Sequence, residues 1–176
     1  MNPEPAGPGL ADPVDVAELV RGAQRGDSMA MHELLDLLAP YVGRLCGPIA
    51  LQDGPDATQE ALIAIFRGIR QLREPAALYG WARAIAVRES VRMAQRASRS
   101  LPVELAEVPA PGDPQLTADV RDVLERLSPQ HRAVLVLREL EGLDERTVSA
   151  MLEVSTGTVK SRLHRARRSF QKAWER

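Results

Sequence analysis

The chain has 176 residues and a formal net charge of −1, with 44% hydrophobic, 27% charged and only 3% aromatic residues. This composition fits one or two small globular domains, and the helical spacing of Val, Ile, Leu and Ala favours an all-α fold without a sheet. The single cysteine, Cys46, excludes an internal disulfide framework and a multi-cysteine zinc site, and favours a cytoplasmic protein.

The charges are segregated along the chain. Residues 1–60 hold 10 acidic and 3 basic side chains, whereas residues 61–99 hold 2 and 8. The alternation repeats, with 10 acidic and 5 basic side chains in residues 100–152, then 2 and 7 in residues 153–176. Two basic surfaces for a polyanion are one interpretation of this pattern, and ordinary solvated helix surfaces are the other.

The N-terminal segment, residues 1–13, is rich in Pro and Gly and is acidic. It therefore predicts a disordered tail instead of a secretory signal. No run approaches the roughly 18 apolar residues of a membrane span, so none is expected.

Residues 14–97 predict the first helical domain. Apolar residues from Val14 to Leu38 recur at spacings of three and four around a turn at Gly26 and Asp27, which predicts two short helices with Asp27 or Ser28 capping the second. Pro40 predicts a kink or an end, followed by a third helix over residues 41–51.

An amphipathic helix is predicted over residues 56–72. Its inward stripe, at about 100° per residue, consists of Leu62, Ile65, Phe66, Ile69 and Leu72. The opposite face carries Asp56, Glu60, Ile63 and Arg67 and is available to a partner.

A loop is predicted at residues 73–77, because Pro75 interrupts the helical pattern, and a further helix begins near Leu78. One face of that helix changes from apolar to basic: Trp81, Ile85, Arg88, Arg92, Arg96 and Arg99. A phosphate backbone would compensate the mutual repulsion of these arginines, although snorkelling or pairing with acidic helices explains them as well.

A linker is predicted over residues 98–116, which contain four prolines and no sustained period. Residues 117–176 then predict a second helical domain. Ser128 and Pro129 begin one helix, Asp144 caps another, and Ser155 caps the last. The inward residues include Val134, Leu135, Leu137, Leu140, Val148, Met151 and Leu152. The last two helices and their tight turn predict a helix-turn-helix unit.

The final helix has a narrow apolar stripe of Val159, Leu163, Ala166 and Phe170, and the rest of its surface is polar or basic. Gly157 leaves the backbone N–H groups of the first turn open to a phosphate. This form is that of a helix that enters the DNA major groove. Its candidate DNA contacts are Gly157, Thr158, Lys160, Ser161, Arg162, His164, Arg165, Arg167 and Arg168.

Residues 128–168 resemble region 4 of bacterial RNA polymerase sigma factors of the extracytoplasmic-function (ECF) subfamily. The family pattern is close to LPxxxRxVLxLRxxEGLSxxEIAxxLGVxxGTVKSRLxRAR, and the segment GTVKSRLHRAR is the most specific match. Residues 19–97 resemble region 2, because DATQEALIAIF and LREPAALYGWARAIA are similar to two of its motifs.

The resemblance implies an initiation factor without catalytic activity, cofactor or metal, a monomer when free. Its implied partners are core RNA polymerase, through the clamp of the largest subunit and the flap, promoter DNA, and an anti-sigma factor. It implies that the final helix reads the upstream (minus-35) element. The implied core-binding residues are Asp56, Gln59, Glu60 and Arg67. The implied contacts with the downstream (minus-10) element are Arg73, Glu74, Pro75, Ala76, Ala77, Tyr79, Arg83, Arg88 and Arg92.

Two departures from the family pattern bear on structure. Arg88 stands where Asn is common, and Glu153 stands where the turn usually has Gly. Glu153 would cost about 1 kcal/mol if the turn requires a left-handed backbone.

Two alternatives remain open: a helix-turn-helix regulator that binds DNA without polymerase, and a sigma mimic that only titrates an anti-sigma factor. An enzyme is not expected, because His32, His131 and His164 lie on separate predicted helices and no phosphate loop occurs. The sigma-factor hypothesis requires an exposed ridge at residues 160–168 and two helical bodies that are not merged around one core.

Overall fold

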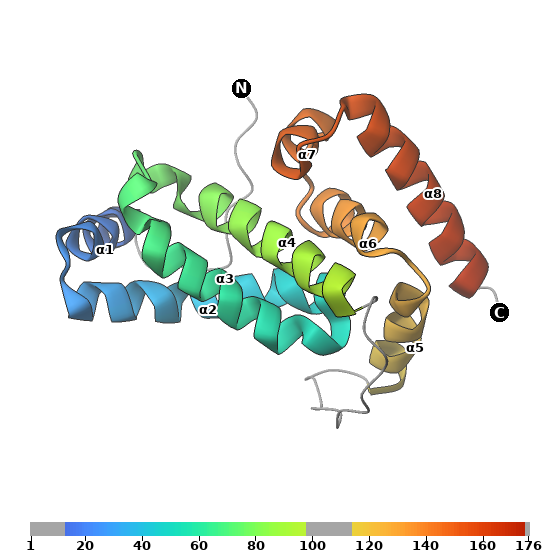
Figure 1. The fold of residues 1–176 in the computed structure, drawn as a ribbon, viewed down its shortest axis with the longest axis horizontal. Coiled ribbons are helices and arrows are strands. Elements are labelled where there is room, and N and C mark those ends of the chain that lie inside the picture. Colours follow the sequence, from blue (N-terminus) through green and yellow to red (C-terminus); the bar gives the residue numbers. More distant parts are fainter. Residues whose placement is uncertain (1–12, 98–113, 175–176) are drawn as a thin grey trace.

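Two groups of helices form the structure, a computed structural model that describes residues 13–97 and 114–174 (Figure 1). The N-terminal group contains α1 (Pro13–Arg25), α2 (Ser28–Ala50), α3 (Gly54–Gly68) and α4 (Leu78–Ala97). The C-terminal group contains α5 (Pro114–Glu125), α6 (Pro129–Leu135), α7 (Glu145–Leu152) and α8 (Thr156–Trp174). No strand occurs within these two ranges, and the predicted all-α fold is confirmed. Most of the predicted tail and of the predicted linker lies outside the described residues.

The turn between α1 and α2 follows the sequence prediction. Gly26 adopts a φ of 91°, which favours glycine. The Asp27 carboxylate accepts hydrogen bonds from the backbone N–H groups of Met29 (2.9 Å) and Ala30 (3.2 Å) and so caps α2.

The predicted helix end at Pro40 is wrong, because α2 continues without a break through Pro40 and Pro48 to Ala50. A proline inside a helix costs about 3 kcal/mol. Buried residues lie on both sides of Pro40, among them Leu34, Leu38 and Leu45. The burial of this long stripe outweighs the local preference for a break.

The inward face of α3 differs from the predicted stripe. Ala57, Ala61 and Ile65 are fully buried, whereas Phe66 is 53% exposed. Small alanines at a spacing of four let α3 lie close to α2 and α4, and this rotation turns Phe66 toward solvent.

The C-terminal group contains a π-helical segment, Val136–Leu140, that the sequence pattern did not predict. The N–H of Glu141 donates to the Val136 carbonyl (3.0 Å), a five-residue spacing. The extra residue in this turn shifts the register, so that Leu140, predicted to be buried, is 66% exposed. In addition, α5 begins at Pro114, before the predicted end of the linker.

The helix-turn-helix unit is present as predicted. Asp144 accepts a hydrogen bond from the N–H of Thr147 (2.7 Å), and Ser155 accepts one from the N–H of Thr158 (3.1 Å). Between the two helices, Glu153 adopts the left-handed conformation, with φ 54° and ψ 43°. A residue with a Cβ atom therefore occupies a position that favours glycine.

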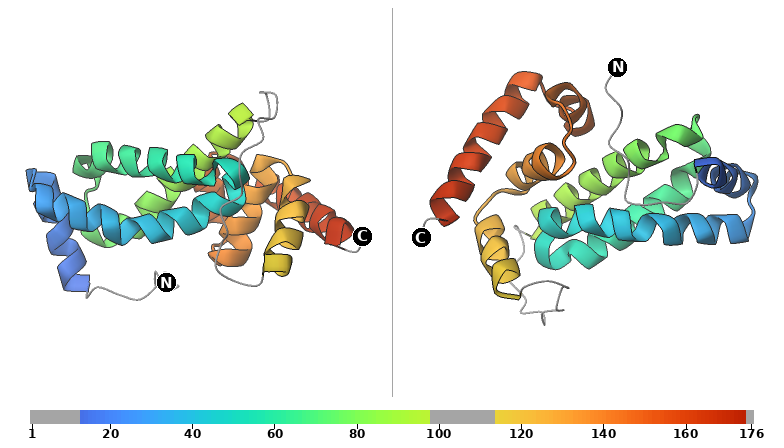
Figure 2. Two further views of the ribbon diagram at one scale, coloured as in Figure 1. Left: turned by 90° about the horizontal axis from the view of Figure 1, so that it is seen from below. Right: turned by 180° about the vertical axis from the view of Figure 1, so that it is seen from behind.

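The two groups contact each other along one side. In Figures 1 and 2 they remain recognisable as separate bodies, with α6 against α4 and α8 along the outer side of α6. Their buried apolar residues nevertheless form one continuous cluster, which the prediction of two unmerged bodies did not anticipate.

A buried arginine of α6 also joins the two groups. The Arg132 guanidinium is bonded to three backbone carbonyls, those of Ile49 (2.7 Å) on α2, Leu124 (3.2 Å) and Leu127 (2.7 Å). Burial lowers the pKa of Arg132, and the nearby Glu125 opposes this effect. These carbonyl bonds supply the partners that a buried cation requires.

Replacing Glu153 by glycine is expected to raise the free energy of unfolding by about 1 kcal/mol, since glycine adopts the left-handed conformation without strain. Urea denaturation followed by circular dichroism measures the change. The matched control is Ala150→Gly within α7, which is expected to lower the free energy of unfolding by about 1 kcal/mol. An unchanged midpoint for Glu153→Gly would show that the turn is not strained.

Candidate nucleic-acid interface

The helix α8 presents a polar face because a narrow apolar stripe holds it against the other helices of its group. Val159 and Ala166 are fully buried, Leu163 is 5% exposed, and Phe170 is half-buried. The predicted stripe of α8 is thus confirmed.

The residues predicted to contact the minus-35 element share the outer face of α8. Thr158 and Arg162 are half-buried, at the edge of this face. The exposed members are Gly157, Lys160, Ser161, His164, Arg165, Arg167 and Arg168. The structure therefore brings them together as one exposed, mostly basic surface, which we call the α8 basic face.

Two cations of the α8 basic face lie beside carboxylates of the same helical group. Lys160 Nζ is 3.5 Å from Glu145 Oε2 on α7, and the Arg167 guanidinium donates to Glu139 Oε1 from Nε (2.9 Å) and Nη2 (2.6 Å). Exposed pairs of this kind contribute at most about 1 kcal/mol, so a phosphate can replace either carboxylate.

The α8 basic face also acts on a neighbouring histidine. Partial burial, and then the positive charges of Arg162 and Arg165, lower the pKa of His131 on α6. His131 is thus held in its neutral form to a lower pH than an ordinary histidine.

The first helix of the unit has a charged cap. The backbone and side-chain hydrogen bonds from Thr147 lower the pKa of Asp144 below its ordinary value. The ionised form of Asp144 is therefore the form that caps α7.

The predicted minus-10 loop forms an exposed turn before α4. Arg73, Glu74, Ala76 and Ala77 are exposed, and Pro75 is half-buried. The segment before this loop is tied to α1, because Gln24 Nε2 donates to the carbonyls of Ile69 (3.0 Å) and Leu72 (2.7 Å).

Tyr79 is half-buried. Its ring packs edge-on against the ring of Tyr41, with centroids 5.3 Å apart and an interplanar angle of 87°. Burial raises the pKa of Tyr79. The contact with Tyr41 therefore limits the access of a base to the Tyr79 ring.

The three arginines predicted to follow the minus-10 DNA do not share one face of α4. Arg88 and Arg92 lie on the predicted face, but Arg83 is about 180° from Arg92 around the helix. The Arg83 side chain is only 5% exposed, and its Nη1 is 3.3 Å from Glu141 Oε2 of the C-terminal group. In this arrangement Arg83 is an internal ion-pair partner.

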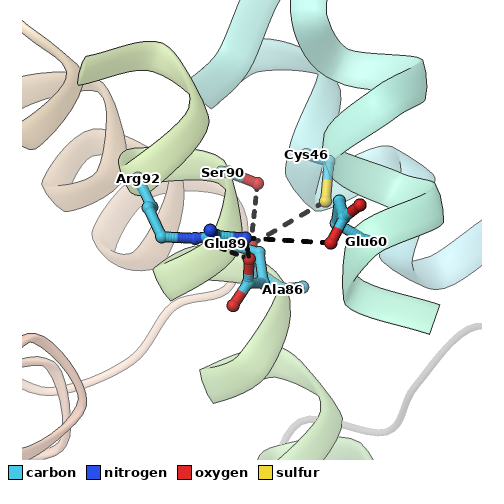
Figure 3. Close-up of polar contacts among 6 residues, drawn as sticks. All are labelled: Cys46, Glu60, Ala86, Glu89, Ser90 and Arg92. Carbon is cyan, nitrogen blue, oxygen red and sulfur yellow. Dashed lines mark hydrogen bonds and ion pairs between the residues drawn. The ribbon is translucent and has the colours of Figure 1, made fainter. Parts of the chain in front are cut away.

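Arg88 and Arg92 also have acidic neighbours. Arg88 Nε donates to the Ala84 carbonyl (3.2 Å), and Nη1 is 3.6 Å from Glu153 Oε1. Arg92 lies between Glu89 on its own helix (Nε to Oε2, 2.9 Å) and Glu60 on α3 (3.8 Å), as Figure 3 shows.

A buried polar cluster lies beside Arg92 in Figure 3. Cys46 Sγ and Ser90 Oγ both donate to the Ala86 carbonyl, at 3.8 Å and 2.7 Å. Burial raises the pKa of the Cys46 thiol. Cys46 is fully buried, as the sequence analysis expected.

The predicted core-binding residues Asp56, Gln59, Glu60 and Arg67 are all exposed on α3. A groove between α3 and α4 adjoins them, with walls formed by Ile63, Arg67, Trp81, Ile85 and Arg92 among others. Phe66 adds an exposed aromatic ring to the same helix. Sequence reasoning missed it, because its position at the edge of the apolar stripe resembles that of a core residue.

The sequence analysis also did not predict that the side chains of Glu141 and Arg132 are buried and hold the structure together. Both residues match fixed positions of the region 4 motif, and this match is the feature of the sequence that could have identified them.

Two further properties of the described residues concern metal binding and membrane insertion. No group of three or more His, Cys, Asp or Glu side chains lies close enough there to hold a metal ion. The expectation that no stretch is apolar enough for a membrane span needs a correction, since the segment Ser28–Gln71 contains such a window, with a mean hydropathy of 1.3 and 44% of it buried in the structure. The core helices of water-soluble proteins give the same result.

Comparisons with known proteins agree with the geometry of α8. The family model described as "Sigma-70, region 4" matches residues 117–170. The ECF RNA polymerase sigma factor SigE of Mycolicibacterium smegmatis is 34% identical in an alignment 163 residues long, and the match covers 83% of this chain and 63% of that protein. This chain thus spans less than two thirds of the length of that relative.

Other relatives match over nearly their whole length. The ECF RNA polymerase sigma-E factor of Haemophilus influenzae is 28% identical, over 92% of this chain and 96% of the relative. The sigma-E factor of Escherichia coli is 27% identical, over 92% and 93%.

Two solved structures share the fold. CnrH in complex with the cytosolic domain of CnrY has a TM-score of 0.63 at 19% identity, covering 92% of this chain and 97% of that one. The sigma factor RpoE of Bartonella quintana, in complex with the anti-sigma factor NepR, has a TM-score of 0.63 at 21% identity, covering 82% and 96%. The helix-turn-helix with its basic face, the region 4 match and relatives that span both helical groups agree, and the chain is similar along both groups to RNA polymerase sigma factors of the extracytoplasmic-function family.

Proposed function

We propose that this protein binds core RNA polymerase, recognises the minus-35 and minus-10 elements of a promoter, and promotes duplex opening and transcription initiation. The observation that carries the proposal is the α8 basic face, displayed by the second helix of a helix-turn-helix unit. A major groove admits an α-helix, and phosphate contacts orient it while base contacts give specificity.

Each part of α8 has a proposed role. Lys160, Ser161, His164 and Arg165 read base edges of the minus-35 element, because Lys and Arg donate to guanine O6 and N7. Arg162 and Arg167 contact the flanking phosphates. The exposed first turn around Gly157 brings backbone N–H groups to a phosphate, with Thr158 and Arg168 at the two ends of the surface.

The N-terminal group is proposed as sigma region 2, over residues 14–97, and the C-terminal group as region 4, over residues 117–176. The outer face of α3 binds the clamp of the largest polymerase subunit, and the C-terminal group binds the flap. The exposed carboxylates Asp56 and Glu60 fit a protein partner better than they fit DNA.

Duplex opening is proposed to involve the loop at residues 73–77 and the basic surface of α4. Flipping a base costs a few kcal/mol of unstacking, which contacts with the extruded base offset. The loop backbone is the main candidate for these contacts, because the Tyr79 ring is packed against Tyr41.

The remaining proposals follow from this function. The protein works in the cytoplasm, where its polymerase and DNA are, as a monomer when free and without catalytic activity of its own. An anti-sigma factor controls it, a proposal supported by the RpoE relative, whose structure was solved with the anti-sigma factor NepR.

A helix-turn-helix regulator that acts without polymerase is the alternative that the α8 basic face also supports. That regulator would give a footprint on duplex DNA with the purified protein alone at moderate salt. A sigma factor gives a promoter-specific transcript only with core polymerase. The sigma mimic does not account for the base-reading residues on α8.

Lys160→Ala and Arg165→Ala are each expected to reduce transcription that depends on the minus-35 element by about 5- to 140-fold, the equivalent of one lost base contact of about 1–3 kcal/mol. Run-off transcription with core polymerase on genomic fragments, with and without the upstream element, measures the loss. Arg121→Ala is the matched control, because Arg121 lies on α5 beside Glu125 and is not part of the α8 basic face. Equal transcript levels from the wild type and both variants would contradict the assignment of α8.

Asp56→Lys is expected to weaken binding to core polymerase by about tenfold, since charge reversal at an interface replaces attraction by repulsion. Fluorescence anisotropy of the labelled protein titrated with core polymerase, without DNA, measures the affinity. Glu33→Lys is the control, because it makes the same change at an exposed site on α2. If the two variants bind equally well, the outer face of α3 is not the contact.

A further inference from the structure

A cavity with three arginines in its wall lies between α4 and the C-terminal group. Arg88 and Arg92 belong to α4, and Arg162 belongs to α8. Glu153 is the one carboxylate among the described residues that line the cavity, so three guanidinium groups and one carboxylate give its wall a formal charge of +2. We call this cavity the arginine pocket. A positive wall favours an anionic ligand.

The arginine pocket also has an apolar part. It consists of Val91 from α4 and of Met151, Leu152 and Val154 from the helix-turn-helix unit, all partly buried against the hydrophobic core. The volume of the pocket, about 310 Å³, lies at the lower end of the range of roughly 300–1,000 Å³ for small-molecule sites. A small ligand with an apolar part and an anionic part fits these walls, whereas a folded partner is too large.

Each arginine of the pocket retains N–H groups for a ligand. Arg92 donates to Glu89 from Nε and Nη2, and a guanidinium has five N–H donors, so Nη1 remains for a ligand. Arg88 Nη1 lies 3.6 Å from Glu153, an exposed pair of the weak kind that a phosphate can replace. No ion pair joins Arg162 to a carboxylate of the residues that the structure describes.

Arg92 is also held in position. Besides Glu89 on its own helix, it has Glu60 of α3 at 3.8 Å, as Figure 3 shows. A side chain that is already fixed loses less conformational entropy when a ligand binds. The pocket is thus partly organised before a ligand arrives.

The charge of Arg162 also acts on a residue beside the pocket. Burial is the first cause that lowers the pKa of His131 on α6, and the charges of Arg162 and Arg165 lower it further. Nearby cations act in this direction because they disfavour a second positive charge. The field in this region is therefore positive, as an anion site requires.

Gln130 of α6 adds a half-buried amide to the wall. A glutamine amide donates and accepts hydrogen bonds in one plane, and this geometry matches N6 and N7 of adenine. Guanidinium groups bind phosphate oxygens in pairs. The amide, the apolar side chains and the arginines together match the base and the phosphates of an adenine nucleotide.

We propose that the arginine pocket binds an adenine mononucleotide, with its phosphates on Arg88, Arg92 and Arg162 and its base on Gln130 and the apolar side chains. The proposal goes beyond the proposed function, which gives these arginines contacts with promoter DNA alone. Binding is reversible, and no covalent bond is made or broken.

Isothermal titration calorimetry of the full chain, without DNA or polymerase, tests the site with ADP as the probe and inorganic pyrophosphate as the comparison. The expected result is one ADP per chain, bound about tenfold or more tightly than pyrophosphate. The difference arises because burial of the base adds to the contacts of the phosphates.

Arg162→Ala is expected to weaken ADP binding by about tenfold or more, the result of losing a charge-assisted hydrogen bond. Arg168→Ala is the matched control, because Arg168 is exposed on the same helix but does not line the pocket. It is expected to leave the affinity for ADP unchanged.

Gln130→Glu tests the site from a second helix. The substitution keeps the size of the side chain and adds a negative charge beside the ligand, so ADP binding is expected to weaken by about tenfold. Gln52→Glu makes the same change at an exposed position after α2 and is expected to have no effect. Circular dichroism checks that the four variants retain their helical content.

Equal weakening by Arg162→Ala and Arg168→Ala would overturn the proposal, because ADP would then bind diffusely to a basic surface. Equal affinities for ADP and pyrophosphate would overturn it as well, since the base would make no contact, and so would the absence of ADP binding. None of these results removes the proposed function, which run-off transcription with core polymerase tests separately.

Discussion

Buried guanidinium groups need partners, and this need governs how the two helical groups meet. Arg132 satisfies it with three backbone carbonyls, one of them from α2, whereas Arg83 satisfies it with the carboxylate of Glu141. Both arginines bond to a partner in the other group, and Arg132 also bonds to two carbonyls of its own group. The contact consequently has a specific geometry, and it depends on each arginine and on each of its partners.

Basic side chains on α8 and on α4 differ in how easily a phosphate can replace their acidic partners. Lys160 and Arg167 on α8 lie beside exposed carboxylates that a phosphate can replace at little cost. Arg83 on α4 lies beside an enclosed carboxylate and is not replaced so easily. Exposure thus distinguishes the α8 basic face, which is open to an anionic partner, from Arg83, which the contact between the two groups covers.

Strain and irregular backbone lie close to this contact. The π turn before Glu141 and the left-handed Glu153 are both unfavourable locally, and both direct an acidic side chain toward the N-terminal group. Both irregular segments therefore contribute an acidic side chain to the contact between the two groups.

The sequence by itself determined the helices with strong periods and caps, the helix-turn-helix unit and the exposed side of α8, because these depend on neighbours three or four residues apart. Tertiary structure alone decided that α2 continues through Pro40, that Phe66 is exposed and that Leu140 gives its buried place to Glu141. Each of these depends on partners far away in the chain, whose packing outweighs the local preference. The role of Arg83 is decided in the same way, since only the folded chain brings it within 3.3 Å of a carboxylate 58 residues away.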